Sequence, residues 1–437
     1  MRKMTKLYIT LCTLFFSLLS VAQQTPAPAQ EQEIIIVGAT AHIGNGEVIE
    51  NAVIAFKDGK ITEVASASEK NLDASNAKVI YAEGKHVYPG FIAPNSTLGL
   101  VEVDAVRASD DEDEIGSFLP HIRSIIAYNT ESKIVESMRP NGVLLAQVTP
   151  RGGRISGTSS VVQLDAWNWE DAIVKEDDGI HLNWPNRFVK KGAWYDPKVG
   201  YKADEKYDEK VQEILSFFKQ AKAFSKEGSS ALNIPLEAMK GVFSGEKTVF
   251  IHVDAEKDIL DVLHFKTEMQ LGNVVIVGGK YAHQVADELV KHEVPVLVGR
   301  VHATPEADDD DYDLPYKLPR LLHEAGVLVG LENSGQMERM NARNLPFYAG
   351  TVAAHGLNKE TALQLITLNA AKILGVDQNL GSLEVGKDAT LFISEGDALD
   401  MMGNVLTHAF INGREVSLET HQTRLYERYK EKYAEQE

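Results

Sequence analysis

The middle of the chain alternates short apolar strands with helices, and this pattern limits the fold more than any other feature. Strands are predicted at 248–253, 273–277, 295–298 and 327–330, with a helix between each strand and the next. Because a strand, a helix and a second parallel strand join by a right-handed crossover, the repeat predicts a parallel α/β sheet. The segment 89–379 is long enough for a (β/α)8 TIM barrel with insertions. An open doubly wound sheet is the alternative, although no G-x-G-x-x-G motif follows a strand.

Both ends of the chain carry short strands joined by tight turns. Near the N-terminus, apolar strands between 34 and 56 are followed by an Asp-Gly turn at 58–59. Near the C-terminus, the apolar segment 405–411 is followed by an Asn-Gly turn at 412–413. Both dipeptides are preferred in two-residue hairpin turns. Each piece is too small to be stable alone, so we expect the two pieces to share one sheet.

Residues 1–22 have the order of a secretory signal peptide. Basic residues come first, an apolar run follows at 7–19, and small residues end the segment. This order predicts cleavage near Ala22/Gln23 and a periplasmic or secreted protein, with 23–32 as a flexible leader. Cys12 is the only cysteine of the chain. The mature protein is therefore expected to contain no disulfide and no thiol nucleophile.

The composition is acidic. The chain of 437 residues has a net charge of −19 and a sequence pI of 5.2. An acidic surface repels nucleic-acid phosphates and anionic lipids, so we expect no nucleic-acid partner and, after signal cleavage, no membrane partner. A homo-oligomer is compatible with this composition. The last segment, 419–437, is rich in Arg, Lys, Glu and Tyr and predicts an exposed amphipathic C-terminal helix.

Three motifs together resemble one known family. Residues 87–97 read V-Y-P-G-F-I-A-P-N-S-T, residues 367–375 read T-L-N-A-A-K-I-L-G, and residues 381–389 read G-S-L-E-V-G-K-D-A. They are similar to the first barrel strand, the helix that closes the barrel and the segment after it in the amidohydrolase superfamily, above all in its imidazolonepropionase-type members. The resemblance implies a barrel at 89–379 and a composite β-sandwich built from 33–88 and 380–418.

The same resemblance implies a metal site that is degenerate in this chain. In the family, histidines and one aspartate hold a divalent ion that activates a water molecule. Here Asn95 and Thr97 stand in place of the first-strand histidine pair, and no histidine stands at strand six. His252 matches the strand-five histidine, and Glu332 stands in place of the strand-eight aspartate. We therefore expect at most one divalent metal ion, weakly bound through His252, with Glu332 as the catalytic base.

A glycine-rich loop at 149–157 follows a predicted strand at 142–148. Such a loop can present backbone N–H groups and arginine side chains to a carboxylate or phosphate, and a plain turn is the alternative. His252 and Glu332 are expected to be catalytic. The expected substrate-binding residues are Arg151, Gly152, Gly153, Asn95, Thr97 and Asn333.

Two further kinds of segment flank the predicted barrel mouth. Tryptophans bracket 165–185, which predicts a lid or rim packed by aromatic residues. Acidic runs at 110–114 and 308–311 are expected to be solvated loop faces. Alternatively, their carboxylates supply oxygen ligands for calcium or magnesium.

Two functions are compatible with these features. The first is hydrolysis of a non-peptide or cyclic C–N bond in a small-molecule substrate, as the family resemblance implies. The second is a catalytically inactive amidohydrolase-fold protein with a binding or regulatory role. The missing histidine pair favours the second function, whereas His252 and Glu332 favour the first.

Overall fold

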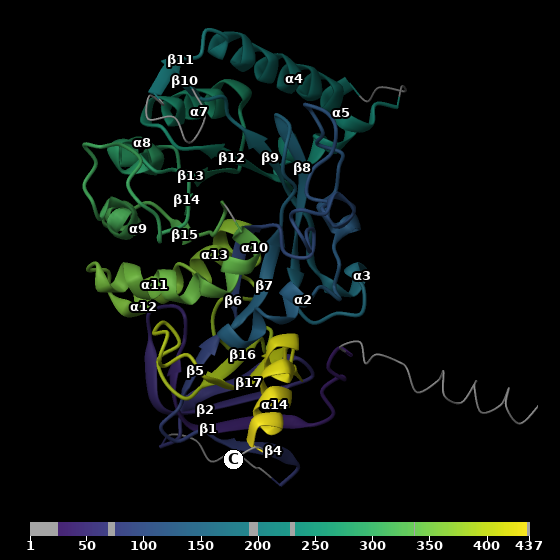
Figure 1. Cartoon of the computed structure of the whole chain (residues 1–437), viewed down its shortest axis with the longest axis vertical. Coiled ribbons are helices and arrows are strands. Elements are labelled where there is room, and N and C mark those ends of the chain that lie inside the picture. The colour runs from purple at the N-terminus through teal and green to yellow at the C-terminus, as the bar shows by residue number, and fades with distance from the viewer. Residues whose placement is uncertain (1–24, 69–74, 192–199, 228–231, 336, 435–437) are drawn as a thin grey trace, which may run out of the picture.

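The computed structural model describes residues 25–68, 75–191, 200–227, 232–335 and 337–434. The predicted signal peptide at 1–22 and its cleavage site lie outside the described residues. Figure 1 shows the barrel with its helices above a second, smaller layer that contains strands from both ends of the chain. Within the described ranges, no helix is long and apolar enough to span a membrane.

Eight strands form the barrel sheet, and it is nearly closed. Leu331 N–H donates to the Leu365 carbonyl oxygen at 3.1 Å, and Ile92 N–H donates to the Ile366 carbonyl oxygen at 3.0 Å, so the segment 365–366 bridges the last strand and the first. The TIM-barrel-type α/β fold is therefore confirmed. In sheet order the strands are β6 (Phe91–Ser96), β7 (Val143–Val148), β8 (Ile155–Gln163), β9 (Ile173–Asn183), β12 (Thr248–Val253), β13 (Val274–Gly278), β14 (Val296–Val298) and β15 (Val329–Leu331).

The strands β12 to β15 follow the predicted β-then-α repeat. Each pairs with the next in parallel, and helices connect them along the outside of the barrel. The helices of this half are α7 (Glu256–Met269), α8 (Ala286–Lys291), α9 (Leu314–Glu324), α10 (Glu338–Asn341), α11 (Leu345–Ala354), α12 (Lys359–Gln364) and α13 (Leu368–Leu374). Short 3-10 helices lie at Ala282–Val285 and Ala342–Asn344.

The strands β7 to β9 depart from the repeat. β8 pairs antiparallel with both β7 and β9, because the loop 149–154 is too short for the crossover that a parallel neighbour requires. The prediction of a lid at 165–185 is wrong for most of that segment, since β9 is a barrel strand that pairs with β12. The other elements before β12 are α2 (Lys133–Glu136), α3 (Trp169–Ala172), β10 (Phe188–Lys191), β11 (Gly200–Ala203), α4 (Tyr207–Glu227), α5 (Ile234–Ala238), α6 (Lys240–Ser244) and 3-10 helices at Arg107–Ser109, Ser124–Ala127 and Arg139–Asn141.

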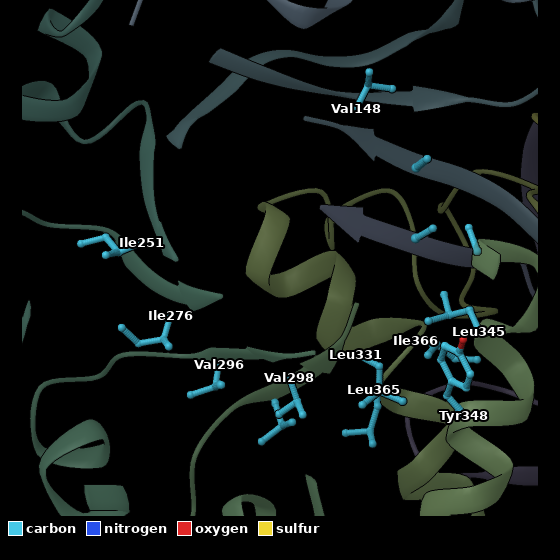
Figure 2. Close-up of a cluster of buried hydrophobic side chains, with 14 of the residues drawn as sticks. Val148, Ile251, Ile276, Val296, Val298, Leu331, Leu345, Tyr348, Leu365 and Ile366 are labelled. Atoms are coloured by element: carbon cyan, nitrogen blue, oxygen red, sulfur yellow. The ribbon is translucent and has the colours of Figure 1, made fainter. Parts of the chain in front are cut away.

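Alternation along the barrel strands separates two hydrophobic layers. Phe250, Val275 and Leu297 lie in an inner cluster that also contains α13 residues such as Ile373. The next residues along the strands face the surrounding helices. Figure 2 shows this outer layer as a row of side chains from Ile251, Ile276, Val296 and Val298 toward Leu331, Leu345 and Tyr348. The Asn369 side chain contacts the backbone where β15 begins, and the Lys175 side chain contacts the backbone where α13 ends. Helix α13 therefore lies across the end of the barrel opposite its mouth.

A second sheet contains strands from both ends of the chain. β5 pairs antiparallel with β16, which joins the N-terminal strands to the C-terminal ones. Its strand order is β18-β17-β16-β5-β1-β2-β3, with β4 paired to β1. The strands are β1 (Glu33–His42), β2 (Val48–Lys57), β3 (Lys60–Ser66), β4 (Ala77–Tyr81), β5 (His86–Pro89), β16 (Leu391–Ser394), β17 (Leu406–Ile411) and β18 (Arg414–Glu415). This sheet has a hydrophobic cluster of its own, which includes Ile36, Phe56 and Phe410.

The two terminal segments differ in how they contact the fold. Ala27 N–H donates to Asp165 Oδ2 at 2.9 Å, and Gly59 N–H donates to Gln30 Oε1 at 2.9 Å. The described part of the predicted flexible leader is thus held against the fold, because its backbone completes a buried polar cluster around Asp165. The predicted C-terminal helix is present as α14 (His421–Ala434), and its residues are largely exposed.

Candidate functional site

A pocket of about 560 Å³ lies at the carboxyl ends of β12 to β15. His252, Gly278, Gly299 and Glu332 line it from four successive strands or the residues just after them. Trp184, which follows β9, contributes an aromatic wall. Because side chains at these strand ends converge on the barrel axis, the pocket lies where TIM-barrel enzymes hold their substrates.

Glu332 is buried at this pocket, with 1% of its surface exposed. The Ser334 hydroxyl donates to Glu332 Oε1 at 2.8 Å, and the Ser334 backbone N–H donates to Oε2. Asn95 Nδ2 donates to Oε2 at 3.2 Å. Burial raises the pKa of Glu332 to about 7, although the hydrogen bonds from Ser334 oppose this shift. The carboxyl group can therefore exchange a proton near neutral pH, as a general base requires.

His252 lies on β12 and contacts a second histidine. His252 Nε2 lies 3.0 Å from His181 Nδ1, and His181 Nε2 lies 3.0 Å from the Ser159 hydroxyl oxygen. Burial, with a smaller contribution from the positive charge of Arg151, lowers the pKa of His252 to about 3. Burial likewise lowers the pKa of His181 well below its usual value. Both imidazoles are thus neutral at physiological pH and act as hydrogen-bonding groups.

A buried polar network supports the two histidines from β7, β8 and β9. Gln147 Nε2 donates to Asp178 Oδ2 at 2.7 Å, and the Ser159 hydroxyl donates to Asp178 Oδ1 at 2.7 Å. Burial raises the pKa of Asp178 to about 6. No motif in the sequence pointed to Gln147, Ser159, Asp178 or His181. The available signal was a lone polar residue, Gln147, inside the otherwise apolar strand at 143–148.

Arg151 and Asn95 are brought together next to Glu332. Arg151 Nη1 donates to Asn95 Oδ1 at 3.0 Å, and Arg151 Nη2 donates to the Asn95 carbonyl oxygen at 2.8 Å. Arg151 Nη2 also lies 2.7 Å from Glu338 Oε1. Thr97 is fully buried beyond β6, and its hydroxyl oxygen has no hydrogen-bond partner among the described residues.

The remaining predicted substrate-binding residues contact protein groups. The carbonyl oxygens of Gly152 and Gly153 accept hydrogen bonds from Asn183 Nδ2 at 3.2 and 3.0 Å. Gly152 has a φ of +79°, and a Cβ at this position would lie 3.0 Å from the Asp113 side chain, so the loop requires glycine here. Asn333 Nδ2 donates to the Glu338 carbonyl oxygen at 2.6 Å.

The donor set does not fit the metal site that the family resemblance implies. Among the described residues, no group of three or more His, Cys, Asp or Glu side chains could hold a metal ion. Asn95 is hydrogen-bonded through both ends of its amide, and the guanidinium of Arg151 brings a positive charge to its Oδ1. A divalent cation at that oxygen would face electrostatic repulsion.

The acidic runs serve as loop contacts. Asp310 Oδ2 accepts hydrogen bonds from the Tyr281 hydroxyl and the Ala307 N–H, both at 2.8 Å. Asp113 Oδ1 lies 3.1 Å from Arg107 Nη1. Both carboxylates therefore stabilise the loops that carry them.

Comparisons with known proteins agree with this architecture. A profile of the amidohydrolase family matches residues 316–416. The imidazolonepropionase of Symbiobacterium thermophilum is 25% identical over 372 residues, which cover 79% of this chain and 84% of that protein. The imidazolonepropionase of Fusobacterium nucleatum subsp. nucleatum is 25% identical over 174 residues, or 37% of this chain and 41% of the relative.

The solved structures give the same result for the fold. An amidohydrolase from Thermotoga maritima MSB8 superposes with a TM-score of 0.75 at 24% identity, covering 88% of this chain and 99% of that one. The family profile, the two relatives and this fold together support the amidohydrolase superfamily for this chain.

Proposed function

We propose that this protein hydrolyses a C–N bond other than a peptide bond in a small molecule, with Glu332 as general base and His252 as a hydrogen-bond acceptor at the pocket. The observation that carries the proposal is the buried Glu332 carboxyl group at the pocket, whose pKa of about 7 suits proton transfer at neutral pH. Amidohydrolase relatives that are imidazolonepropionases make a cyclic C–N bond the first class to test.

The chemistry follows from these two groups. Glu332 removes a proton from a water molecule as the water oxygen forms a bond to the substrate carbonyl carbon. The same proton is then donated to the nitrogen as the C–N bond breaks, which regenerates the carboxylate. The Ser159 hydroxyl donates to Asp178, so His181 donates to Ser159 and the single N–H of neutral His252 donates to His181. His252 Nδ1 is therefore a hydrogen-bond acceptor that can help to orient the attacking water molecule.

Two substitutions test this function. We expect Glu332→Gln and His252→Asn each to reduce kcat/KM by about 100-fold or more on any active member of a panel of lactams, hydantoins, imidazolone rings and N-acyl amino acids. Glu136→Gln is the matched control, because Glu136 is an equally buried glutamate that contacts the start of α14 and not the pocket. Full activity in both pocket variants, with all three proteins folded, would contradict the proposal.

The alternative function is a catalytically inactive protein that binds a small molecule in this pocket. It is favoured by the substituted positions Asn95 and Thr97 and by the absence of a metal-ligand cluster among the described residues. Ligands that raise the thermal midpoint without being consumed, across the same panel, would support this alternative over hydrolysis.

The same proposal includes the domain organisation and the location of the protein. A signal peptide at 1–22 would direct the chain to the periplasm or the exterior, and the sheet that joins both termini would be the composite β-sandwich at 33–88 and 380–418. N-terminal sequencing of the protein from its native host tests the first part, with Gln23 as the expected first residue. Size-exclusion chromatography with light scattering tests for a homo-oligomer.

A further inference from the structure

We propose that Arg151, acting through Asn95, is a positioning residue that aims the Glu332 carboxylate into the pocket and takes the place that a metal cation would need. This inference rests on the proposed role of Glu332. It differs from the expected role of Arg151 as a substrate clamp, because the guanidinium is directed at protein acceptors from two other segments of the barrel mouth.

The guanidinium joins three parts of the chain. Arg151 lies in the loop between β7 and β8, where its backbone N–H donates to the Glu112 carbonyl oxygen at 2.6 Å. Its side chain contacts Asn95 at the end of β6 and Glu338 at the start of α10. The planar fork reaches both the side-chain and the main-chain oxygen of Asn95, a geometry that a lysine ammonium cannot reproduce.

Asn95 is held in one conformation by these contacts. Its φ of +49° lies in the left-handed region, which a non-glycine residue adopts when its surroundings require it. Its backbone N–H donates to Gln147 Oε1 at 3.0 Å, so the main chain is fixed from the opposite side as well. Strand β6 is thereby locked to the polar network of β7 and β9.

The orientation of the Asn95 amide follows from the arginine. Because Oδ1 accepts from Arg151, Nδ2 must point the other way, and it donates to Glu332 Oε2 at 3.2 Å. Ser334 binds the same carboxylate from the other end. Glu332 is thus held between Asn95 and Ser334 while still lining the pocket.

Arg151 also brings a positive charge near Glu332 and His252. Its charge favours the ionised form of Glu332 and the neutral form of His252. A bound metal cation would have the same two effects on its neighbours. A fixed guanidinium beside Asn95 Oδ1 therefore replaces the charge of a metal and repels one that approaches this oxygen.

Kinetics of four variants test the positioning role on the most active substrate of the panel above. We expect Asn95→Ala, Arg151→Met and Arg151→Lys each to lower kcat at least tenfold with KM within twofold of the wild type, because Lys restores the charge but not the fork. The double variant Arg151→Met/Glu338→Gln leaves no unpaired carboxylate at position 338 and should show the same kinetic loss with normal folding. Arg123→Met is the control, since Arg123 pairs with Asp177 and does not line the pocket.

The outcomes separate this inference from the proposed function. A raised KM with unchanged kcat would make Arg151 a substrate clamp and overturn the inference, as would normal kinetics in Asn95→Ala and Arg151→Met while Glu332→Gln is inactive. If Glu332→Gln is fully active, the proposed function fails instead. Crystal structures of the wild type and Asn95→Ala then decide positioning: an unmoved Glu332 carboxylate in the variant overturns it.

A measurement that does not depend on activity tests the metal replacement. We expect elemental analysis of protein purified without added metal, and calorimetric titration with zinc chloride, to show less than 0.1 equivalent of zinc. Stoichiometric zinc that depends on Asn95, and that is removed by a chelator, would overturn this part of the inference.

Discussion

The two halves of the barrel use the same number of strands for different purposes. From β12 to β15 all strands are parallel, and their carboxyl ends open onto the pocket that holds His252 and Glu332. From β6 to β9 the reversed strand β8 interrupts the repeat, and the interior near the mouth is filled by Gln147, Ser159 and Asp178. The parallel half therefore offers side chains to a ligand, whereas the other half binds its own polar groups to each other.

This difference indicates which buried polar groups contribute to stability and which contribute to function. A network whose members are all hydrogen-bonded makes a rigid wall, and removing one member leaves the others unsatisfied. A carboxyl group held buried beside a pocket costs stability in its ionised form, and in the proposed function this group carries the chemistry. Changes in the network of Gln147, Ser159 and Asp178 should therefore act on folding, and changes at His252 and Glu332 should act on activity.

The largest expected effect comes from breaking the network at its centre. Gln147→Leu removes the acceptor of Asn95 N–H and the donor to Asp178 and Ser159, so we expect the free energy of unfolding to fall by about 3 to 5 kcal/mol. Urea denaturation measures the change. Gln220→Leu, on the exposed face of α4, should stay within about 0.5 kcal/mol of the wild type. If Gln147→Leu and Gln220→Leu lost the same free energy of unfolding, the polar network would not be a special source of stability in the β6–β9 half.

In the pocket half, replacing Glu332 with the neutral residue Gln should raise the free energy of unfolding at neutral pH relative to the wild type. Its folded pKa of about 7 lies above the ordinary value of 4.5, so the stability linked to the protonated form is complete below pH 4.5 and is lost as pH rises through 7. Relative to Glu332→Gln, the free energy of unfolding of the wild type should fall by about 3 kcal/mol between pH 4 and pH 8. Denaturation curves at both pH values test this difference, and a parallel pH dependence of the two proteins would contradict it.

Asp178 sharpens the comparison because it is a buried carboxyl group in the network half. Burial raises its pKa from 3.8 to about 6, so its stabilising protonated form is complete below pH 3.8 and is lost as pH rises through 6. Between pH 4 and pH 7 the free energy of unfolding of the wild type should fall by about 2 to 3 kcal/mol because of this group. Asp178→Asn should not show this fall. Above pH 7 the difference between the two proteins should be constant, and a continued divergence there would point to another titrating group.

The smallest expected effect lies at the pocket floor. A Cβ at Gly299 would lie 3.2 Å from Glu332 Oε1, so Gly299→Ala should displace the carboxylate by a few tenths of an ångström. We expect the free energy of unfolding to change by less than about 1 kcal/mol while kcat falls about tenfold. Gly272→Ala, where an added Cβ meets no atom within 4 Å, is the control and should change neither quantity. Destabilisation without a loss of activity would show that Gly299 is a packing residue.

Much of the fold could be predicted from the sequence because hydrophobic periodicity is a local property. The strand at 248–253 has the bounds that were predicted, and the turns at 58–59 and 412–413 join the strands on either side. Three motifs also resembled the superfamily that the comparisons support, and the predicted strand ends placed His252 and Glu332 at one pocket. Each of these features depends on residues that are close in sequence or on strand ends that a barrel must bring together.

Only the tertiary structure decided the rest. Whether Arg151 faces a ligand or Asn95 depends on how the β7–β8 loop packs against β6, and no spacing along the chain encodes that contact. The direction of β8 and the burial of Asp178 and His181 likewise follow from which strands become neighbours. Local sequence sets which residues can form a strand or a helix, whereas hydrogen-bond partners for buried polar groups are available only once distant segments meet.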